Sequence, residues 1–118
     1  RPLVLATLAG TVLQIAMVVA GHFSPAVAAL FAVGGMGISL LAGMLYARLA
    51  RPATKGSAAI GGLIAGAACA FLGIFVSFLL GDVPASLLLL GTVSSTVTGA
   101  IGGVVGTLMN GRVPMPAT

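Results

Sequence analysis

Two ionisable side chains are the candidates for acid–base chemistry in this sequence. His22 is the one histidine and Asp82 the one acidic residue, and each follows a long apolar run. If those two runs are neighbours in the fold, the side chains can meet, and a histidine beside a carboxylate can transfer protons or respond to pH near neutrality. The sequence places no serine or cysteine nucleophile beside them, which favours a solvated structural pair over a catalytic site.

Metal and disulfide chemistry are not expected. Cys69 is the only cysteine and lies deep in an apolar run, so the chain cannot form an internal disulfide. One cysteine, one histidine and one acid do not suffice for a zinc site made from protein ligands alone. We therefore expect no cofactor and no metal site.

The other polar groups within the apolar runs are uncharged. Gln14 lies in the first run, and a hydroxyl-rich segment between Thr92 and Thr98 lies in the fourth. Amides and hydroxyls in lipid commonly hydrogen-bond to a neighbouring helix or back to their own. The alternative is a narrow polar path, which would be lined by Gln14, Ser94, Ser95 and Thr98.

The elements that carry these groups are four apolar runs. Hydrophobic residues make up 59% of the chain and charged residues 5%, against roughly 25% charged residues in soluble domains. A helix needs about 20 apolar residues to cross the hydrocarbon core. The runs cover about 3–21, 25–49, 57–81 and 84–109. We predict an all-α polytopic membrane protein, with one four-helix transmembrane domain over 1–112 and an irregular tail over 113–118.

Short breaks group the runs into two helical hairpins. Ser24 before Pro25 is typical of a helix start, and Gly81 before Pro84 is typical of a helix stop followed by a new start. A parallel tandem repeat and a chance match of glycine-rich sequence both stay open as explanations of a weak alignment between the hairpins. The aligned pairs are Gly10 with Gly66, Pro25 with Pro84, and Gly43 with Gly102.

The basic residues predict the orientation. They are Arg48, Arg51 and Lys55 between the second and third runs, and Arg1 and Arg112 beyond the outer ends of the first and fourth. All of them fall on one side of four spans, so the positive-inside rule places both termini in the cytoplasm and His22 and Asp82 outside. We predict a bacterial inner-membrane protein. The net charge of +4 is too dispersed for a nucleic-acid interface.

Small residues four apart form stripes along the runs and predict close helix packing. Residues four apart share one helix face, and a stripe without side-chain bulk lets two backbones approach each other. The predicted packing positions are Gly10, Gly35, Ser39, Gly43, Gly62, Gly66, Gly91, Ser95, Gly99, Gly103 and Gly106. Several runs carry more small faces than one bundle needs, which favours a homo-oligomer or a place in a larger membrane complex, surrounded by lipid.

The middle of every run lacks an ionisable residue. Proton- and sodium-coupled transporters usually keep an intramembrane ionisable group. The small multidrug exporters share the length and span count of this chain, but their first-span glutamate is missing here. Ion-coupled export is therefore disfavoured.

Glycine motifs in the last three runs carry a resemblance to known proteins. They are Gly43–Arg48 ending the second run, Lys55-Gly56 opening the third, Gly62 and Gly66 within it, and Gly99–Gly106 in the fourth. Through them the chain resembles a group of small bacterial four-span membrane proteins whose function is uncharacterised. The resemblance implies a kinship of fold and no activity, cofactor or functional residue.

These observations leave three functional interpretations, in descending order. The first is a non-enzymatic module that self-associates or serves as a subunit of a membrane complex. The second is a passive channel or carrier for a small neutral or apolar solute. The third is a membrane enzyme that uses His22 and Asp82 at the outer surface.

Overall fold

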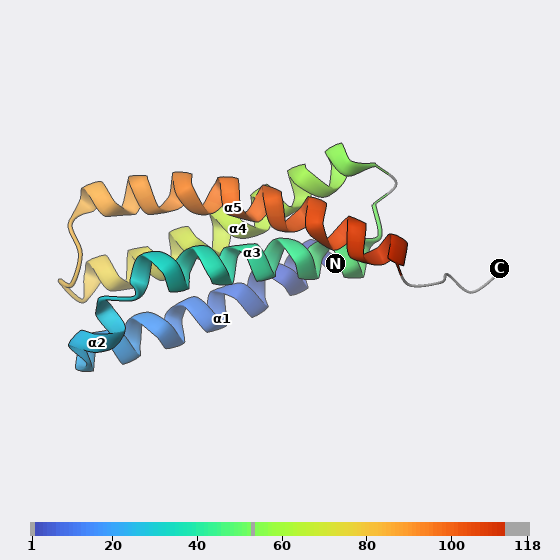
Figure 1. Ribbon diagram of the computed structural model, residues 1–118. Coiled ribbons are helices and arrows are strands. Elements are labelled where there is room, and N and C mark those ends of the chain that lie inside the picture. The colour runs from blue at the N-terminus through green and yellow to red at the C-terminus, as the bar shows by residue number, and fades with distance from the viewer. Residues whose placement is uncertain (1, 53, 113–118) are drawn as a thin grey trace.

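The chain folds into an elongated bundle of α-helices (Figure 1). The computed structural model describes residues 2–52 and 54–112, so the predicted tail at 113–118 and the Arg1 charge lie outside the described residues. The described part contains five helices and no strand, which confirms the all-α prediction. The helices are α1 (Pro2–Phe23), α2 (Pro25–Ala28), α3 (Phe31–Ala50), α4 (Lys55–Leu79) and α5 (Ala85–Arg112).

Four of these helices are long and apolar enough to cross a membrane, within the described residues. The chain is therefore a multi-pass membrane protein, as its composition predicts. The second predicted span differs from the structure, because the backbone leaves the helix at Leu30, between α2 and α3. There the Leu30 N–H bonds to the Val27 carbonyl, a tight turn that ends α2. Residues 26–33 contain no glycine or proline, so hydropathy alone predicts one continuous helix.

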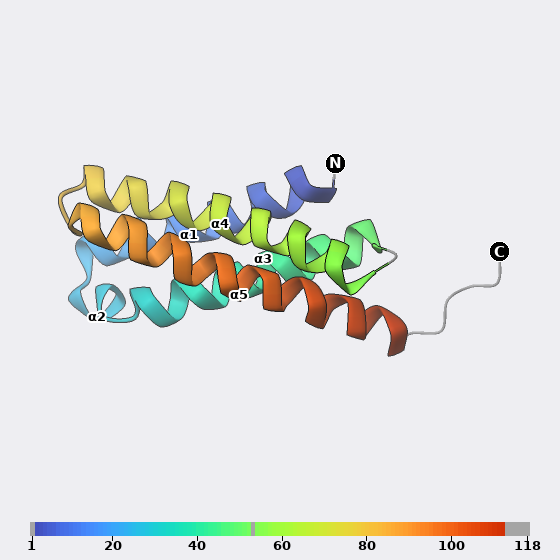
Figure 2. The ribbon, with the colours of Figure 1, turned by 90° about the horizontal axis from the view of Figure 1, so that it is seen from above.

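The long helices alternate in direction along the bundle (Figures 1 and 2). Helices α1 and α5 each pack on both α3 and α4, and α3 also contacts α4. An α3–α4 pair is thus flanked by the first and last helices. We call the end where residues 51–54 join α3 to α4 the loop end, and the end where residues 80–84 join α4 to α5 the turn end.

Three backbones meet at Gly99 on α5. A Cβ atom placed on Gly43 of α3 or on Gly62 of α4 would collide with the Gly99 carbonyl oxygen, and a Cβ on Gly99 would collide with the Gly62 carbonyl. A Cβ on Gly66 would lie 2.8 Å from the Gly99 Cα, and one on Gly103 would collide with the Ala58 carbonyl. We call Gly43, Gly62, Gly66, Gly99 and Gly103 the glycine seam. Backbones this close gain dispersion energy and Cα–H···O contacts, which drive helix association in lipid.

The second small face of α5 packs on α3. A Cβ on Gly102 would collide with the Leu40 carbonyl, and one on Gly106 would lie 2.8 Å from the Met44 carbonyl oxygen. A Cβ on Gly73, on the second small face of α4, would lie 2.5 Å from the Gln14 Cβ of α1. These small faces are therefore used between helices of one chain. Bulky aliphatic residues such as Val97, Ile60 and Leu89 are exposed on the outside of the bundle, where lipid can solvate them.

The helix ends follow recognisable capping patterns. Gly81, with φ +79°, ends α4: its N–H bonds to the Phe78 carbonyl, and the Asp82 N–H bonds to the Ser77 carbonyl at 3.0 Å. These two bonds form a Schellman motif and confirm the predicted helix stop. At the start of α4, the Thr54 hydroxyl accepts a hydrogen bond from the Ser57 N–H at 3.0 Å. The Ser24 side chain makes no such bond, although Pro25 does begin α2.

The seam predicts opposite outcomes for two Gly→Ala substitutions. Gly99→Ala drives a methyl group into the Gly62 carbonyl, so we expect it to lower the free energy of unfolding by about 1–3 kcal/mol, as overpacking does. The matched control is Gly37→Ala, whose Cβ meets nothing within 4 Å. That substitution should leave stability unchanged or raise it by about 0.5–1 kcal/mol. Thermal or denaturant unfolding in detergent micelles measures both; equal stability of the two variants contradicts the seam.

Candidate functional site

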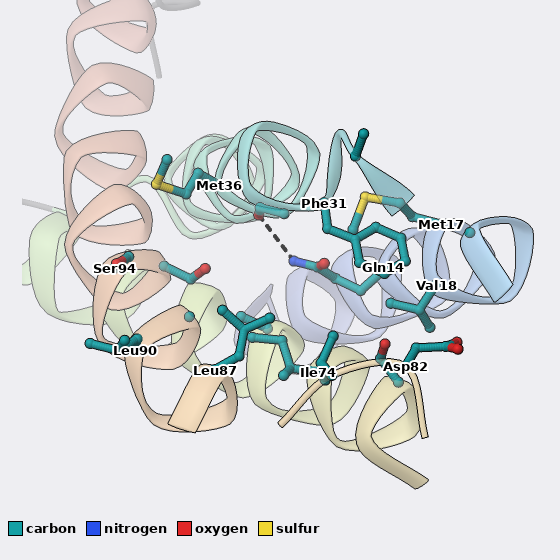
Figure 3. A pocket seen from close by; sticks show the side chains of 18 residues that line it. Gln14, Met17, Val18, Phe31, Met36, Ile74, Asp82, Leu87, Leu90 and Ser94 are labelled. Atoms are coloured by element: carbon teal, nitrogen blue, oxygen red, sulfur yellow. Dashed lines mark hydrogen bonds between the residues drawn. The ribbon is translucent and has the colours of Figure 1, made fainter. Parts of the chain in front are cut away.

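A cavity of about 510 Å³ lies between α1, α3, α4 and α5 in the turn-end half of the bundle (Figure 3). It exists because α3 and α5 touch through Leu40–Ala47 and Gly99–Gly106 near the loop end, while the cavity occupies the space between the same helices beyond those contacts. The residues lining it are Gln14, Met17, Val18, Gly21, Ala29, Phe31, Gly35, Met36, Ala70, Ile74, Ser77, Asp82, Val83, Leu87, Leu90, Gly91, Ser94 and Ser95. A volume of this size is typical of small-molecule sites.

The walls of the cavity are mostly apolar. Met17, Phe31, Ile74 and Leu87 face it from four different segments (Figure 3). Among the described lining residues, Asp82 at the turn end is the only charged side chain, and none is basic. The cavity therefore suits an uncharged molecule with a largely apolar body, because a buried charge would find no opposite charge to pair with.

Gln14 forms the deep polar point of the cavity on α1. Its side chain is 1% exposed, and its amide nitrogen donates to the Gly35 carbonyl at 3.1 Å and to the Ser39 hydroxyl at 3.4 Å, both on α3 (Figure 3). The predicted interhelical hydrogen bond of Gln14 is thus confirmed. Both amide hydrogens are used, and the amide oxygen accepts no hydrogen bond from any described residue.

A small polar cluster lies behind Gln14, in the core. Ser39 and Cys69 are 0% exposed, and each directs its side chain to the Gly66 carbonyl at 3.4 Å. Their oxygen and sulfur atoms lie 3.9 Å apart. These contacts join α1, α3 and α4 through side chains that the sequence presents only as small packing residues. They satisfy one another, so the cluster is structural.

The predicted polar path is only partly assembled. Gln14, Ser94 and Ser95 line the cavity, but Thr98 does not. The Thr98 hydroxyl bonds back to the Ser94 carbonyl at 2.6 Å, as Thr96 does to Thr92 at 2.7 Å. Beyond Ser95 the glycine seam closes the space between α3, α4 and α5. The polar lining therefore ends near the middle of the bundle and does not continue to the loop end.

Ser77 on α4 is a lining residue that sequence reasoning missed. It is 1% exposed, and within the described residues its hydroxyl has no hydrogen-bond partner. Its spacing from Gly73 and Gly81 presents it as one more small packing residue. The large lining residues were missed for a different reason, because an apolar side chain in an apolar helix gives no signal that it borders a cavity.

His22 and Asp82 do meet, at the turn end of the bundle. The His22 Nδ1 lies 2.8 Å from the Asp82 Oδ2, and the side chains are 35% and 27% exposed. The Schellman motif after α4 positions Asp82, whose side chain also borders the cavity (Figure 3). A pair this exposed contributes about 0–1 kcal/mol to stability. No group of three or more His, Cys, Asp or Glu side chains is placed to hold a metal ion, within the described residues.

The basic residues gather at the opposite end. Arg48, Arg51 and Lys55 are exposed at the loop end. Arg112 closes α5 at the same end of the bundle, although its side chain lies outside the described residues (Figure 1). The bundle is thus polarised, with cations at the loop end and the His22–Asp82 pair at the turn end.

Comparisons of the chain with protein-family models, with curated proteins and with solved structures find no match. The resemblance to small bacterial four-span proteins therefore stays a prediction. No ligand, partner or activity comes to the cavity from a relative, and its function has to be argued from its own geometry.

Proposed function

We propose that this chain is a non-enzymatic membrane protein that binds one small, uncharged and largely apolar molecule in the cavity. The observation that carries the proposal is the cavity itself: about 510 Å³, apolar on four sides and ended by the glycine seam. A reactive constellation is not assembled there. His22 lies outside the lining, and Cys69 lies behind Gln14 in the polar cluster. Binding is the chemistry that these residues support.

The orientation is part of the proposal. The cations at the loop end favour the cytoplasmic side, by the positive-inside rule. The cavity would then lie in the outer half of a bacterial inner membrane, with the His22–Asp82 pair at the outer surface and both termini in the cytoplasm. The ordering of the helices supports this, because an even number of spans returns the chain to its starting side.

The ligand would exchange with the membrane and not only with water. Met36 and Leu90 line the cavity and are also 38% and 63% exposed on the outside of the bundle. Met36 on α3 and Ser94 on α5 lie on the side where those two helices face each other (Figure 3). The cavity thus reaches the lipid-facing surface between α3 and α5, which favours a ligand that dissolves in lipid.

Self-association is a separate proposal with less support than the sequence suggests. The extra small faces of α4 and α5 motivate it, yet both pack on helices of the same chain. A homo-oligomer or a larger membrane complex would have to use the bulky aliphatic outer surface. We place ligand binding first for this reason.

A carrier is the second candidate, because Gln14, Ser94 and Ser95 share the cavity. Transport across the bilayer would require α5 to separate from α3 and α4 at the glycine seam, since the cavity ends there. Flux into liposomes distinguishes a carrier from a binding module. A binding module takes up the ligand without moving it across.

Filling the cavity should abolish binding. Gly35→Leu places a side chain into the cavity without a collision, because a Cβ there lies 3.6 Å from the Gln14 Oε1 and 3.9 Å from the Met17 methyl carbon. Gly37→Leu, on the same helix, enters open space and is the matched control. We expect an uncharged alkyl diazirine to photolabel cavity residues in nanodiscs holding the wild type and Gly37→Leu, and not in those holding Gly35→Leu. Equal labelling in all three proteins contradicts the proposal.

Single cysteines test the orientation. Ser86→Cys lies at the start of α5 at the turn end, and Gly56→Cys lies at the start of α4 at the loop end; both positions are exposed. In intact bacteria, a membrane-impermeant maleimide should label Ser86→Cys and leave Gly56→Cys unlabelled until the cells are lysed. The wild type is the control, because Cys69 is buried. The reverse labelling pattern overturns the orientation.

A further inference from the structure

The deepest polar atoms of the cavity define the chemistry of its ligand. Resting on the proposed binding function, we propose that the cavity selects an amphiphile with one uncharged hydrogen-bond donor, a hydroxyl group, which is held by the Gln14 amide oxygen and the Ser77 hydroxyl. The rest of the ligand is an aliphatic body that lies against the apolar walls. The selection for a donor is what goes beyond the binding of any apolar molecule.

The Gln14 amide has one orientation. The Gly35 carbonyl can only accept hydrogen bonds, so the amide nitrogen must face it, at 3.1 Å. The second amide hydrogen is directed to the Ser39 hydroxyl. The amide oxygen therefore remains as an acceptor at a side chain that lines the cavity (Figure 3). Only a ligand that donates a hydrogen bond can satisfy it.

The Ser77 hydroxyl is the second polar group. Hydroxyls in this bundle commonly bond back to the carbonyl four residues earlier, as those of Thr96, Thr98 and Thr107 do. Ser77 does not, and its buried oxygen has no partner within the described residues. A buried hydroxyl without a partner is costly, and here it lies at the surface of a cavity. A ligand can remove that cost.

The two groups lie next to each other along the bundle. The Gly73 backbone packs on Gln14, since a Cβ there would lie 2.5 Å from the Gln14 Cβ. Ser77 follows Gly73 on the same face, one helical turn or about 5.4 Å nearer the turn end. A ligand hydroxyl at this depth can donate to the Gln14 oxygen and accept from Ser77.

Charged and donor-free ligands fit less well. A carboxylate would find no cation among the described lining residues and would share the cavity with Asp82. An ether or an alkane would leave the Gln14 oxygen unpaired. A site built to bind a hydroxyl discriminates strongly against the analogue without it, because the buried polar groups then stay unsatisfied.

Competition with the alkyl diazirine in nanodiscs tests the selection, using dodecanol and dodecyl methyl ether as competitors. In the wild type, dodecanol should block labelling at about a tenfold lower concentration than the ether, as expected for one hydrogen-bonded hydroxyl. In Ser77→Ala this preference should fall to about threefold or less, and in Gln14→Met it should disappear. Ser86→Ala removes an exposed serine outside the lining and should keep the full preference.

The outcomes separate the two proposals. Equal competition by the alcohol and the ether in the wild type, with labelling that Gly35→Leu still abolishes, overturns the hydroxyl selection and leaves the binding function intact. Labelling that Gly35→Leu does not change removes the binding function itself. If Gln14→Met does not fold, the wild type and Ser77→Ala still decide, because Ser77 makes no internal hydrogen bond that its removal would break.

Discussion

The close approach of three helix backbones at Gly99 is the interaction on which the rest of the bundle depends. Lipid solvates apolar side chains as well as a protein core does, so the hydrophobic effect cannot hold these helices together. Dispersion forces and weak Cα–H···O contacts remain, and both require the backbones to touch. Gly43, Gly62 and Gly99 permit this contact because any Cβ at these positions would collide with a carbonyl group. The seam thus replaces a hydrophobic core.

The cavity is a consequence of the same interaction. Glycine contacts hold α5 against α3 and α4 from Gly99 toward the loop end. Toward the turn end, larger residues such as Phe31, Ile74 and Leu87 line the space between the helices, and the helices do not close on it. The Gln14 amide and the cluster behind it lie at the boundary between the two halves. A membrane protein of this size can therefore be rigid in one half and hold a ligand in the other.

The sequence predicts the elements better than their partners. Apolar length is sufficient to predict four spanning helices, and Gly81 is sufficient to predict a helix stop. The turn at Leu30 has no glycine or proline to announce it. Periodicity shows which residues share a face, but it does not show which helix that face contacts. For this reason the second small face of α5 suggests an oligomer, although it packs on α3.

The site shows the same division. His22 and Asp82 could be paired from the sequence only on the condition that the first and third runs are neighbours, and α1 does pack on α4. Gln14 was recognisable because an amide in an apolar run needs a partner. Ser77 and the apolar walls were not, since the space that they border arises from how the helices diverge and not from any local pattern.

Solid-state NMR in lipid bilayers tests the central claim most directly, using chains with ¹³C-labelled glycine diluted into unlabelled chains. The account predicts a cross-peak between Gly62 and Gly99 that persists at high dilution, because the seam lies within one chain. A cross-peak that disappears on dilution would place the contact between chains. Its absence at every dilution would contradict the seam altogether.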